Sequence, residues 1–244
     1  MRAERRPAFY ALATGGWRDY WTLLHPPYTL WHLSYVAIGA AAVPELDGLN
    51  LAAALAGFFL GVGITAHALD ELNGRPLRTR IPDAVLWGLA WVALAGAVAL
   101  GVAGAARVSW WLVAFVAFGA FIVVAYNLEL LGGRFHSDRW FALAWGAFPA
   151  LTGAFAQAGT LPAEAVIVAA ACAALSAAQR TLSTPVRLLR RRAREVSGRI
   201  RLDDGTELPI DERSLRSAPE AALRWLSVAV PLLAGAAVAA RLAR

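Results

Sequence analysis

The fold of this chain is decided by the stretch HALDELNGRPLRTRI, residues 67–81, which follows directly on an apolar run. It contains an imidazole, two carboxylates, an amide and three guanidinium groups in a chain with few charged residues. His67, Asp70 and Glu71 stand at positions i, i+3 and i+4, so on a helix they share one face. The stretch therefore predicts a group of polar side chains held at the end of a hydrophobic helix.

The composition of the chain is that of an integral membrane protein. Hydrophobic residues make up 59% of the 244 residues and charged residues 16%, and the mean hydropathy is +0.52. Soluble domains carry about 25% charged residues. All 23 basic residues are arginine and fall in short blocks between apolar runs, a distribution that sets membrane topology and does not indicate nucleic-acid binding. The single cysteine, Cys172, excludes a disulfide framework.

Seven apolar segments are candidates for membrane helices, because about 20 apolar residues cross the hydrocarbon core. We expect spans at 28–44, 49–70, 83–104, 108–128, 139–157, 163–184 and 219–240. Residues 25–186 would form a six-helix membrane core, and residues 219–244 would contain the final transmembrane helix. The loops on one side then carry 20 arginines and those on the other carry 3. The positive-inside rule therefore predicts a cytoplasmic N-terminus in the cytoplasmic (bacterial inner) membrane.

Two segments are expected outside the bundle. Residues 1–24 mix aromatic rings with arginines, and we interpret them as an amphipathic helix at the membrane interface. An ordinary aromatic belt before the first span is an equal alternative. Residues 187–218 form a basic cytoplasmic segment in which Asp204-Gly205 lies between alternating apolar residues. This pattern predicts a small β-hairpin between the last two helices.

Polar residues recur at the ends of the second, fourth and sixth expected helices. These residues are His67, Asp70 and Glu71, then Tyr126, Asn127 and Glu129, and then Gln179, Arg180 and Arg187. Alternating topology puts the three helix ends on the same side of the membrane, so we expect them to surround one cavity that faces the cytoplasm. Each cluster taken alone has the alternative interpretation of a solvated cap at the membrane interface.

The stretch from Asp70 to Ile81 resembles a shortened form of the first aspartate-rich motif of UbiA-type intramembrane prenyltransferases. In that family, an Asn-Asp-x-x-Asp-x-x-x-Asp run at the end of helix 2 precedes an Arg-Pro-Leu/Ile-x-x-Gly-x-Ile segment, which Arg75-Pro76-Leu77 matches in part. The segment from Tyr126 through the sequence WGAFP, residues 145–149, is similar to the family's helix 4 end and helix 5. The sequence HPPYTL, residues 25–30, resembles the start of its first helix. The resemblance covers roughly residues 20–185 in matching order.

The resemblance implies an all-α, UbiA-like membrane bundle that transfers a prenyl group from an isoprenoid diphosphate to an aromatic or other acceptor, with Mg²⁺. It implies catalytic roles for Asp70, Glu71 and Tyr126, and metal ligation by Asp70, Glu71 and Glu129. The candidates for binding the substrate are His67, Asn73, Arg75, Arg78, Arg80, Asn127, Arg134, Gln179, Arg180 and Arg187. Carboxylate oxygens suit Mg²⁺, and arginine neutralises a leaving diphosphate. Membrane lipid is the other expected partner.

The chain departs from the family at the end of the sixth expected helix. The family's second Asp-x-x-x-Asp motif is replaced by the sequence AAQRTLS, residues 177–183. The chain also has seven expected helices where the family has nine. Two hypotheses remain open: a diverged enzyme in which Glu71 and Glu129 substitute in metal binding, and a non-catalytic UbiA-fold subunit that binds lipid or a protein partner.

Overall fold

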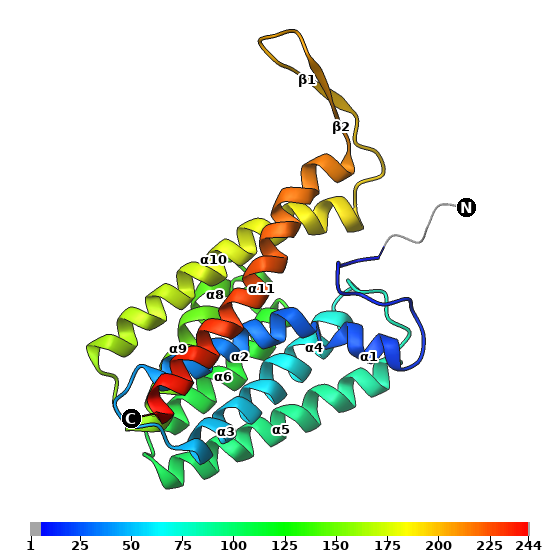
Figure 1. The fold of residues 1–244 in the computed structure, drawn as a ribbon. Helices are drawn as coiled ribbons and strands as arrows, with labels where there is room; N and C mark the ends of the chain where they lie inside the picture. The colour runs from blue at the N-terminus through cyan, green and yellow to red at the C-terminus, as the bar shows by residue number, and fades with distance from the viewer. Residues whose placement is uncertain (1–5, 244) are drawn as a thin grey trace.

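A computed structural model describes residues 6–243 and consists of a helix bundle with a two-stranded hairpin projecting from one end (Figure 1). Each of the seven predicted segments contains a helix. The long helices are α2 (Pro26–Ala41), α3 (Gly48–Phe58), α5 (Asp83–Arg107), α6 (Leu112–Asn127), α9 (Phe148–Ala158), α10 (Ala163–Arg191) and α11 (Glu212–Leu242). The shorter ones are α1 (Trp17–Leu23), α4 (His67–Leu72), α7 (Leu130–Gly133) and α8 (Asp138–Ala142).

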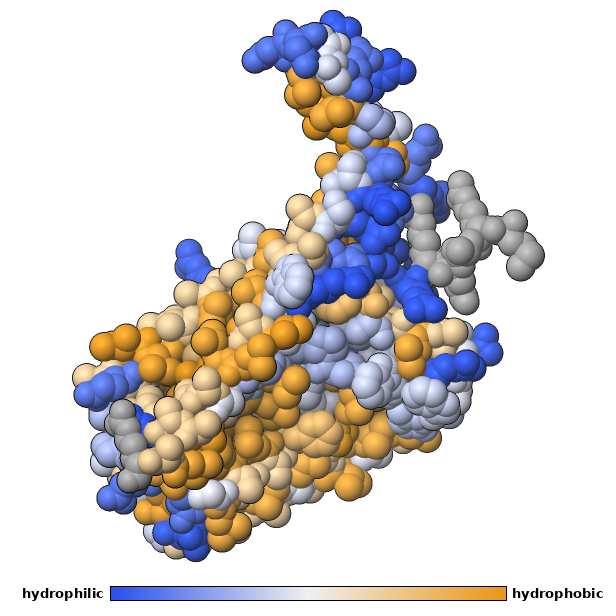
Figure 2. Space-filling view, viewed as in Figure 1, coloured by the Kyte–Doolittle hydropathy of each residue, from blue (hydrophilic) through white to orange (hydrophobic). Residues whose placement is uncertain are grey.

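Four helices in residues 6–243 are long and apolar enough to cross a membrane. They are Gly48–Leu72, Asp83–Arg107, Ala163–Arg191 and Glu212–Leu242. Helices α2 and α6 have 16 residues each, so they are shorter than the roughly 20 residues that cross the hydrocarbon core. Apolar side chains cover the flank of the bundle, and polar side chains gather toward its two ends (Figure 2). The chain therefore has the form of a membrane protein, whereas the count of seven spans and their orientation stay predictions.

Two pairs of consecutive α-helices are joined by a π-helical segment. The segment η1 (Phe59–Ala66) joins α3 to α4, and η2 (Leu143–Ala147) joins α8 to α9. A π-helical turn changes the direction in which side chains point and is frequent at functional sites. Val62 of η1 and Trp145 of η2 belong to the same buried cluster. The two irregular segments therefore meet inside the bundle.

Helices α2 and α9 approach so closely that glycine is required at their contact. A Cβ atom on Gly39 would collide with the backbone of Ala150, and one on Gly153 would collide with the carbonyl of Val36. Small residues allow membrane helices to pack backbone against backbone. This contact fixes the position of α2, whose first turn forms part of the site described below.

The variant Gly39→Ala is expected to lower the free energy of unfolding by about 2 kcal/mol, because the added methyl group meets backbone atoms that cannot rotate away. The measurement is the unfolding midpoint of the purified protein in detergent. Gly235→Ala is the matched control, because a Cβ atom there meets no atom within 4 Å. Equal midpoints for the two variants would contradict the close approach of α2 and α9.

The N-terminal segment is not the continuous helix that its aromatic pattern predicted. Residues 1–5 of the predicted segment lie outside the described residues, and between residues 6 and 24 the helix is limited to α1. Gly15 and Gly16 break it, with φ angles of 114° and 62°. The Asp19 carboxylate accepts hydrogen bonds from the backbone N–H groups of Gly15 (2.9 Å) and Arg80 (3.0 Å). These bonds fold the segment onto the loop that follows α4.

The predicted hairpin is present between the last two helices. Strand β1 (Gly198–Arg201) pairs antiparallel with β2 (Glu207–Ile210), and Ile200 lies opposite Leu208. The Asp204 side chain accepts a hydrogen bond from Thr206 N at 2.8 Å across the turn. The basic stretch after residue 187 is helical, as expected, up to Arg191, where α10 ends, and the last helix begins before the expected residue 219, because α11 starts at Glu212.

Candidate functional site

A polar cavity with about 940 Å³ of empty space lies where α4, α6 and α10 end. Its walls also include the start of α2 and residues 7–10 of the N-terminal segment. Seven of the predicted site residues line it: His67, Asp70, Tyr126, Asn127, Gln179, Arg180 and Arg187. Residues from three distant parts of the chain, at the ends of α4, α6 and α10, therefore line one cavity.

The cavity carries more positive than negative charge. Arg180, Arg187 and Arg191 line it, and Asp70 is its acidic residue. Arg180 is paired with Asp138, with 2.9 Å between Nε and Oδ1. Arg187 bonds to the Thr184 hydroxyl (3.4 Å) and Arg191 to the Pro7 carbonyl (3.3 Å), and among residues 6–243 neither forms an ion pair with a carboxylate. Unpaired cations in a low-dielectric cavity attract an anion.

Three buried polar atoms of residues in the cavity wall have no hydrogen-bond partner within the described chain. They are Nε2 of His25, the hydroxyl oxygen of Tyr126 and Oε1 of Gln179. Tyr126 is 4% exposed and Gln179 is 3% exposed. Because buried polar groups are nearly always paired, these atoms mark a place where a bound ligand would complete the hydrogen bonding.

The end of α10 that carries these arginines is held by Glu220 of α11. Arg190, Arg216 and Arg224 each donate to the Glu220 carboxylate at 2.7–2.9 Å. Arg190 also donates to the carbonyl of Arg6, which draws the N-terminal segment over the same end (3.2 Å). A buried carboxylate with three guanidinium partners is well satisfied. The cavity wall formed by α10 is therefore anchored on two sides.

Glu71, predicted as a catalytic group and metal ligand, lies outside the cavity lining and organises the loop after α4. Its Oε2 accepts a hydrogen bond from Leu77 N at 2.9 Å. Its Oε1 accepts from the backbone N–H (2.8 Å) and the hydroxyl (2.9 Å) of Thr79. Both oxygens of this fully buried carboxylate are occupied, so the geometry favours a structural role over the predicted ones.

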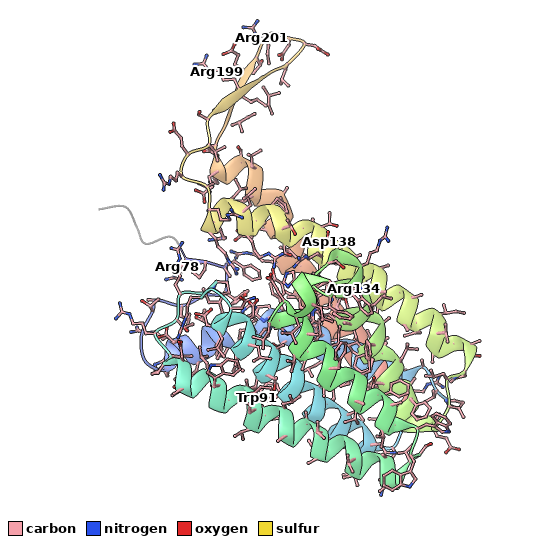
Figure 3. All side chains as sticks on the ribbon, turned by 180° about the vertical axis from the view of Figure 1, so that it is seen from behind. Arg78, Trp91, Arg134, Asp138, Arg199 and Arg201 are labelled. Atoms are coloured by element: carbon pink, nitrogen blue, oxygen red, sulfur yellow. The ribbon has the colours of Figure 1, made fainter. Side chains whose placement is uncertain are left out.

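The other predicted residues of this loop and of the α7 region also lie outside the lining. Arg75 donates to the Ile81 carbonyl at 2.6 Å and forms an ion pair with Asp83. Asn73 donates to the Asn127 carbonyl at 3.2 Å. Arg78, which donates to the Arg191 carbonyl at 3.3 Å, is exposed like Arg80 and Arg134, and Figure 3 labels Arg78 and Arg134. None of these side chains lines the cavity.

The three carboxylates of the predicted magnesium site do not gather. Asp70 lines the cavity, Glu71 is bonded within the loop, and the Glu129 carboxylate is about half exposed, with Oε1 3.8 Å from His136 Nδ1. No group of three or more His, Cys, Asp and Glu side chains in the described residues could hold a metal ion. The predicted ligand set therefore does not fit Mg²⁺, and Asp70 is the carboxylate that the cavity provides.

Several lining residues were not predicted as site residues, and Tyr10, His25 and Arg191 are among them. Arg191 could have been found, because it follows Arg187 by four positions and so shares its helix face. His25 and Tyr10 reach the cavity because residues 7–10 return over the start of α2. That contact is tertiary and leaves no periodic signal in the sequence.

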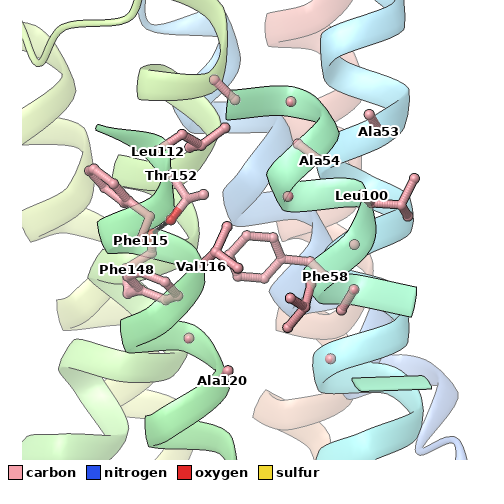
Figure 4. A pocket seen from close by; sticks show the side chains of 18 of the residues that line it. Ala53, Ala54, Phe58, Leu100, Leu112, Phe115, Val116, Ala120, Phe148 and Thr152 are labelled. Atoms are coloured by element: carbon pink, nitrogen blue, oxygen red, sulfur yellow. Dashed lines mark hydrogen bonds between the residues drawn. The ribbon is translucent and has the colours of Figure 1, made fainter. Parts of the chain in front are cut away.

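A second, apolar cavity with about 910 Å³ of empty space lies between α3, η1, α5, α6 and α9 (Figure 4). Its walls include Phe58, Phe115 and Phe148. Val62 and Trp145, from the two π-helical segments, line both cavities. The polar and the apolar cavity are therefore neighbours that share a wall made of these two side chains.

Comparisons of the chain with protein-family models, with curated proteins and with solved structures found no match. The fold and the site define a helical membrane protein with an internal cationic cavity beside an apolar one.

Proposed function

We propose that the chain is a UbiA-like membrane prenyltransferase or a related enzyme that acts on an isoprenoid diphosphate. The observation that carries the proposal is that a cavity rich in arginine adjoins an apolar cavity across Val62 and Trp145. An isoprenoid diphosphate has the same two parts, an anionic head group and an apolar chain. Arginine suits phosphate oxygens through paired N–H donors, and an apolar cavity suits a hydrocarbon chain.

In the proposed reaction, the C1–O bond of the prenyl diphosphate breaks and its electron pair leaves with the diphosphate. A new bond then forms between C1 and the nucleophilic atom of the acceptor, and the proton that this atom loses passes to the released diphosphate. Arg187 and Arg191, with Arg180, stabilise the charge that develops on the leaving group. Asp70 is the carboxylate of the same cavity and, in its ionised form, stabilises the developing carbocation. No step is assigned to Mg²⁺, because its predicted ligands do not gather.

We also propose that the polar cavity and the hairpin face the cytoplasm of a bacterial inner membrane. The support is the distribution of arginines between the two sides of the seven-span topology, with 20 on the side of the cavity and 3 on the other. Substrates would then reach the arginines from the cytoplasm or from the inner leaflet.

A non-catalytic subunit that binds an isoprenoid diphosphate or a similar lipid is the second candidate function. It is favoured by the dispersal of Asp70, Glu71 and Glu129 in the described structure. Both candidates bind the same ligand, and they differ in its fate.

The deciding experiment incubates the purified protein in lipid nanodiscs with labelled isoprenoid diphosphates, divalent cations and a panel of aromatic and lipid acceptors. The enzyme releases pyrophosphate and moves the label to a product, and Asp70→Asn abolishes the transfer. Full transfer by Asp70→Asn would contradict the role of Asp70. Tight binding with the diphosphate recovered intact across the panel would overturn the enzyme and support the subunit.

The apolar cavity gives a prediction of its own. Gly61→Leu places a side chain in this cavity, where an added Cβ atom meets no atom within 4 Å. We expect it to weaken binding of a long-chain diphosphate about tenfold and to leave binding of dimethylallyl diphosphate unchanged. Equilibrium binding to nanodiscs measures both affinities.

Gly88→Leu is the matched control for this variant, because Gly88 is an exposed helix position that also has open space around it. It should bind both diphosphates as the unmodified protein does. Equal loss of affinity for the short and the long chain in Gly61→Leu would show that the chain does not occupy the apolar cavity.

A further inference from the structure

The hairpin formed by β1 and β2 projects from the end of the helix bundle (Figure 1), and Figure 3 shows Arg199 and Arg201 on it. Every residue from 198 to 209 is exposed. Within the described chain, neither cavity is lined by residues of the hairpin. An isolated two-stranded hairpin is only marginally stable in water, so this hairpin gains stability when a further element covers it.

The two helices that carry the hairpin are fixed to each other at its base. Helix α11 begins directly after β2, because Asp211 is its N-cap and accepts a hydrogen bond from Ser214 N at 2.6 Å. Arg190 of α10 and Arg216 of α11 both donate to the Glu220 carboxylate, at 2.7 and 2.9 Å. The hairpin is therefore presented from a rigid base.

The hydrogen bonding of the hairpin decides which backbone groups point outward. Leu202 N donates to the carbonyl of Thr206 at 2.9 Å, so these residues form a hydrogen-bonded pair. Hydrogen-bonded and non-hydrogen-bonded pairs alternate along an antiparallel ladder. With the observed register, Arg201 and Arg199 therefore belong to non-hydrogen-bonded pairs. Their backbone N–H and C=O groups point away from β2, at the outer edge of β1.

The outer edges of the two strands differ in what they can bind. Pro209 lies opposite Arg199 and so occupies the corresponding outward position on β2. Proline has no N–H group, and a proline at the edge of a sheet opposes the addition of a further strand. Strand β1, with the sequence GRIR, contains no proline. The edge of β1 is therefore open, whereas that of β2 is blocked.

The two faces of the hairpin differ in chemistry. Arg199 and Arg201 share one face and both pair with Glu207, at 2.8 and 2.9 Å. Two guanidinium groups on one carboxylate leave an excess of positive charge, and both arginine side chains are largely exposed. Ile200 and Leu208 lie opposite each other on the other face and are also exposed. A strand that adds to β1 thus meets positive charge on one face and apolar side chains on the other.

We propose that β1 binds an extended segment of a partner protein by antiparallel strand addition, and that this segment alternates acidic with apolar residues. Its acidic residues lie opposite Arg199 and Arg201 and exchange backbone hydrogen bonds with them, and its apolar residues extend the face of Ile200. Opposite charges directly across two strands are stabilising. In such complexes the backbone bonds give affinity and the side chains give specificity. The proposal does not depend on the proposed diphosphate function.

A second copy of this chain and a lipid surface fit the β1 edge less well. Antiparallel pairing of β1 with β1 of another copy, with the apolar faces aligned, places arginine opposite arginine, and like charges directly opposite are destabilising. An anionic lipid neutralises the arginines, but it supplies no strand for the outward N–H groups of Arg199 and Arg201. Charge and backbone geometry together therefore favour an acidic protein segment.

Strand addition is tested with a short labelled peptide in which glutamate alternates with valine, titrated into the full-length protein in nanodiscs of zwitterionic lipid. Fluorescence anisotropy measures its affinity. Methylating the glutamate amide nitrogens removes the N–H groups that face β1, and we expect binding about tenfold weaker. Methylating the valine amide nitrogens is the matched control and should change nothing, because those groups face away. Equal binding of the two methylated peptides would overturn strand addition.

The charge preference and the edge are tested on the same preparation. A peptide in which lysine alternates with valine should bind at least about tenfold more weakly than the glutamate peptide, and equal binding would contradict the proposed partner chemistry. Arg199→Pro removes an outward N–H group and no bond of the ladder, so it should weaken binding of the glutamate peptide about tenfold. Arg199→Gln keeps that group and should weaken it only about threefold.

Amide hydrogen exchange, measured by NMR without peptide, tests the hairpin and the other occupants. The amides of Ile200 and Leu208 should stay protected in both variants, which shows that the hairpin persists. The amides of Arg199 and Arg201 should exchange rapidly in the unmodified protein and slow down when the glutamate peptide binds. Protection that rises with protein concentration would replace the partner by a second copy. Protection that appears only in anionic nanodiscs would replace it by lipid.

Discussion

Replacing Arg187 with glutamine is expected to weaken binding of pyrophosphate about 100-fold, because the change removes a charge-assisted contact to the anion. Arg187 lines the polar cavity, and its side chain donates a long hydrogen bond of 3.4 Å to the Thr184 hydroxyl. Without a carboxylate partner among the described residues, its charge is available to a ligand. Calorimetric titration of the purified protein at fixed ionic strength measures the effect, since salt screens such contacts.

The matched control is Arg134→Gln, which removes an arginine that was also predicted to bind substrate. Arg134 is exposed and lies outside the cavity lining. Its replacement should change pyrophosphate affinity by no more than about twofold, as expected for a screened surface charge. The unfolding midpoint of both variants should equal that of the unmodified protein. Equal loss of affinity in both variants would show that the anion binds by overall charge and not in this cavity.

The second large effect is expected for Glu71→Ala, which should lower the free energy of unfolding by about 3 to 5 kcal/mol. The change leaves the N–H groups of Leu77 and Thr79, and the Thr79 hydroxyl, buried without their acceptor. Water cannot easily replace the carboxylate, since Glu71 is 0% exposed. Thermal or denaturant unfolding in detergent micelles measures the loss.

Glu129→Ala removes the other glutamate of the predicted metal site and serves as the control. The Glu129 side chain is 53% exposed, so its loss should change stability by no more than about 0.5 kcal/mol. A catalytic Glu71 would behave differently. Glu71→Ala would then unfold at the native midpoint and lose only prenyl transfer, and this result would contradict the structural role.

The arrangement of helices could be predicted from the sequence because its signals are local. Apolar runs of sufficient length, bounded by residues such as Pro82 and Pro162, gave the positions of the helices. Asp204-Gly205 between alternating apolar residues gave the hairpin, which the structure confirms. Asp70 and Arg187 both line the polar cavity. Their proximity was expected because, in the predicted topology, every second span ends on the same side of the membrane.

The roles of neighbouring residues could not be predicted, because they depend on how loops fold back. Asp70 and Glu71 are adjacent and chemically alike, yet one lines the cavity and the other binds loop N–H groups. That loop turns through Arg75 and Arg78, with φ angles of 54° and 58°, which no local pattern indicates. Similarly, only the tertiary fold brings Tyr10 to the cavity.

In the proposed complex, the polar cavity binds a diphosphate whose chain occupies the neighbouring apolar cavity. The most direct test is an experimental structure of the protein in nanodiscs with geranylgeranyl thiodiphosphate, which resists cleavage. We expect the diphosphate to contact Arg187 and Arg180, and the chain to pass Val62 and Trp145 into the apolar cavity. A ligand whose head group lies away from Arg187, or whose chain lies outside the apolar cavity, would contradict the claim.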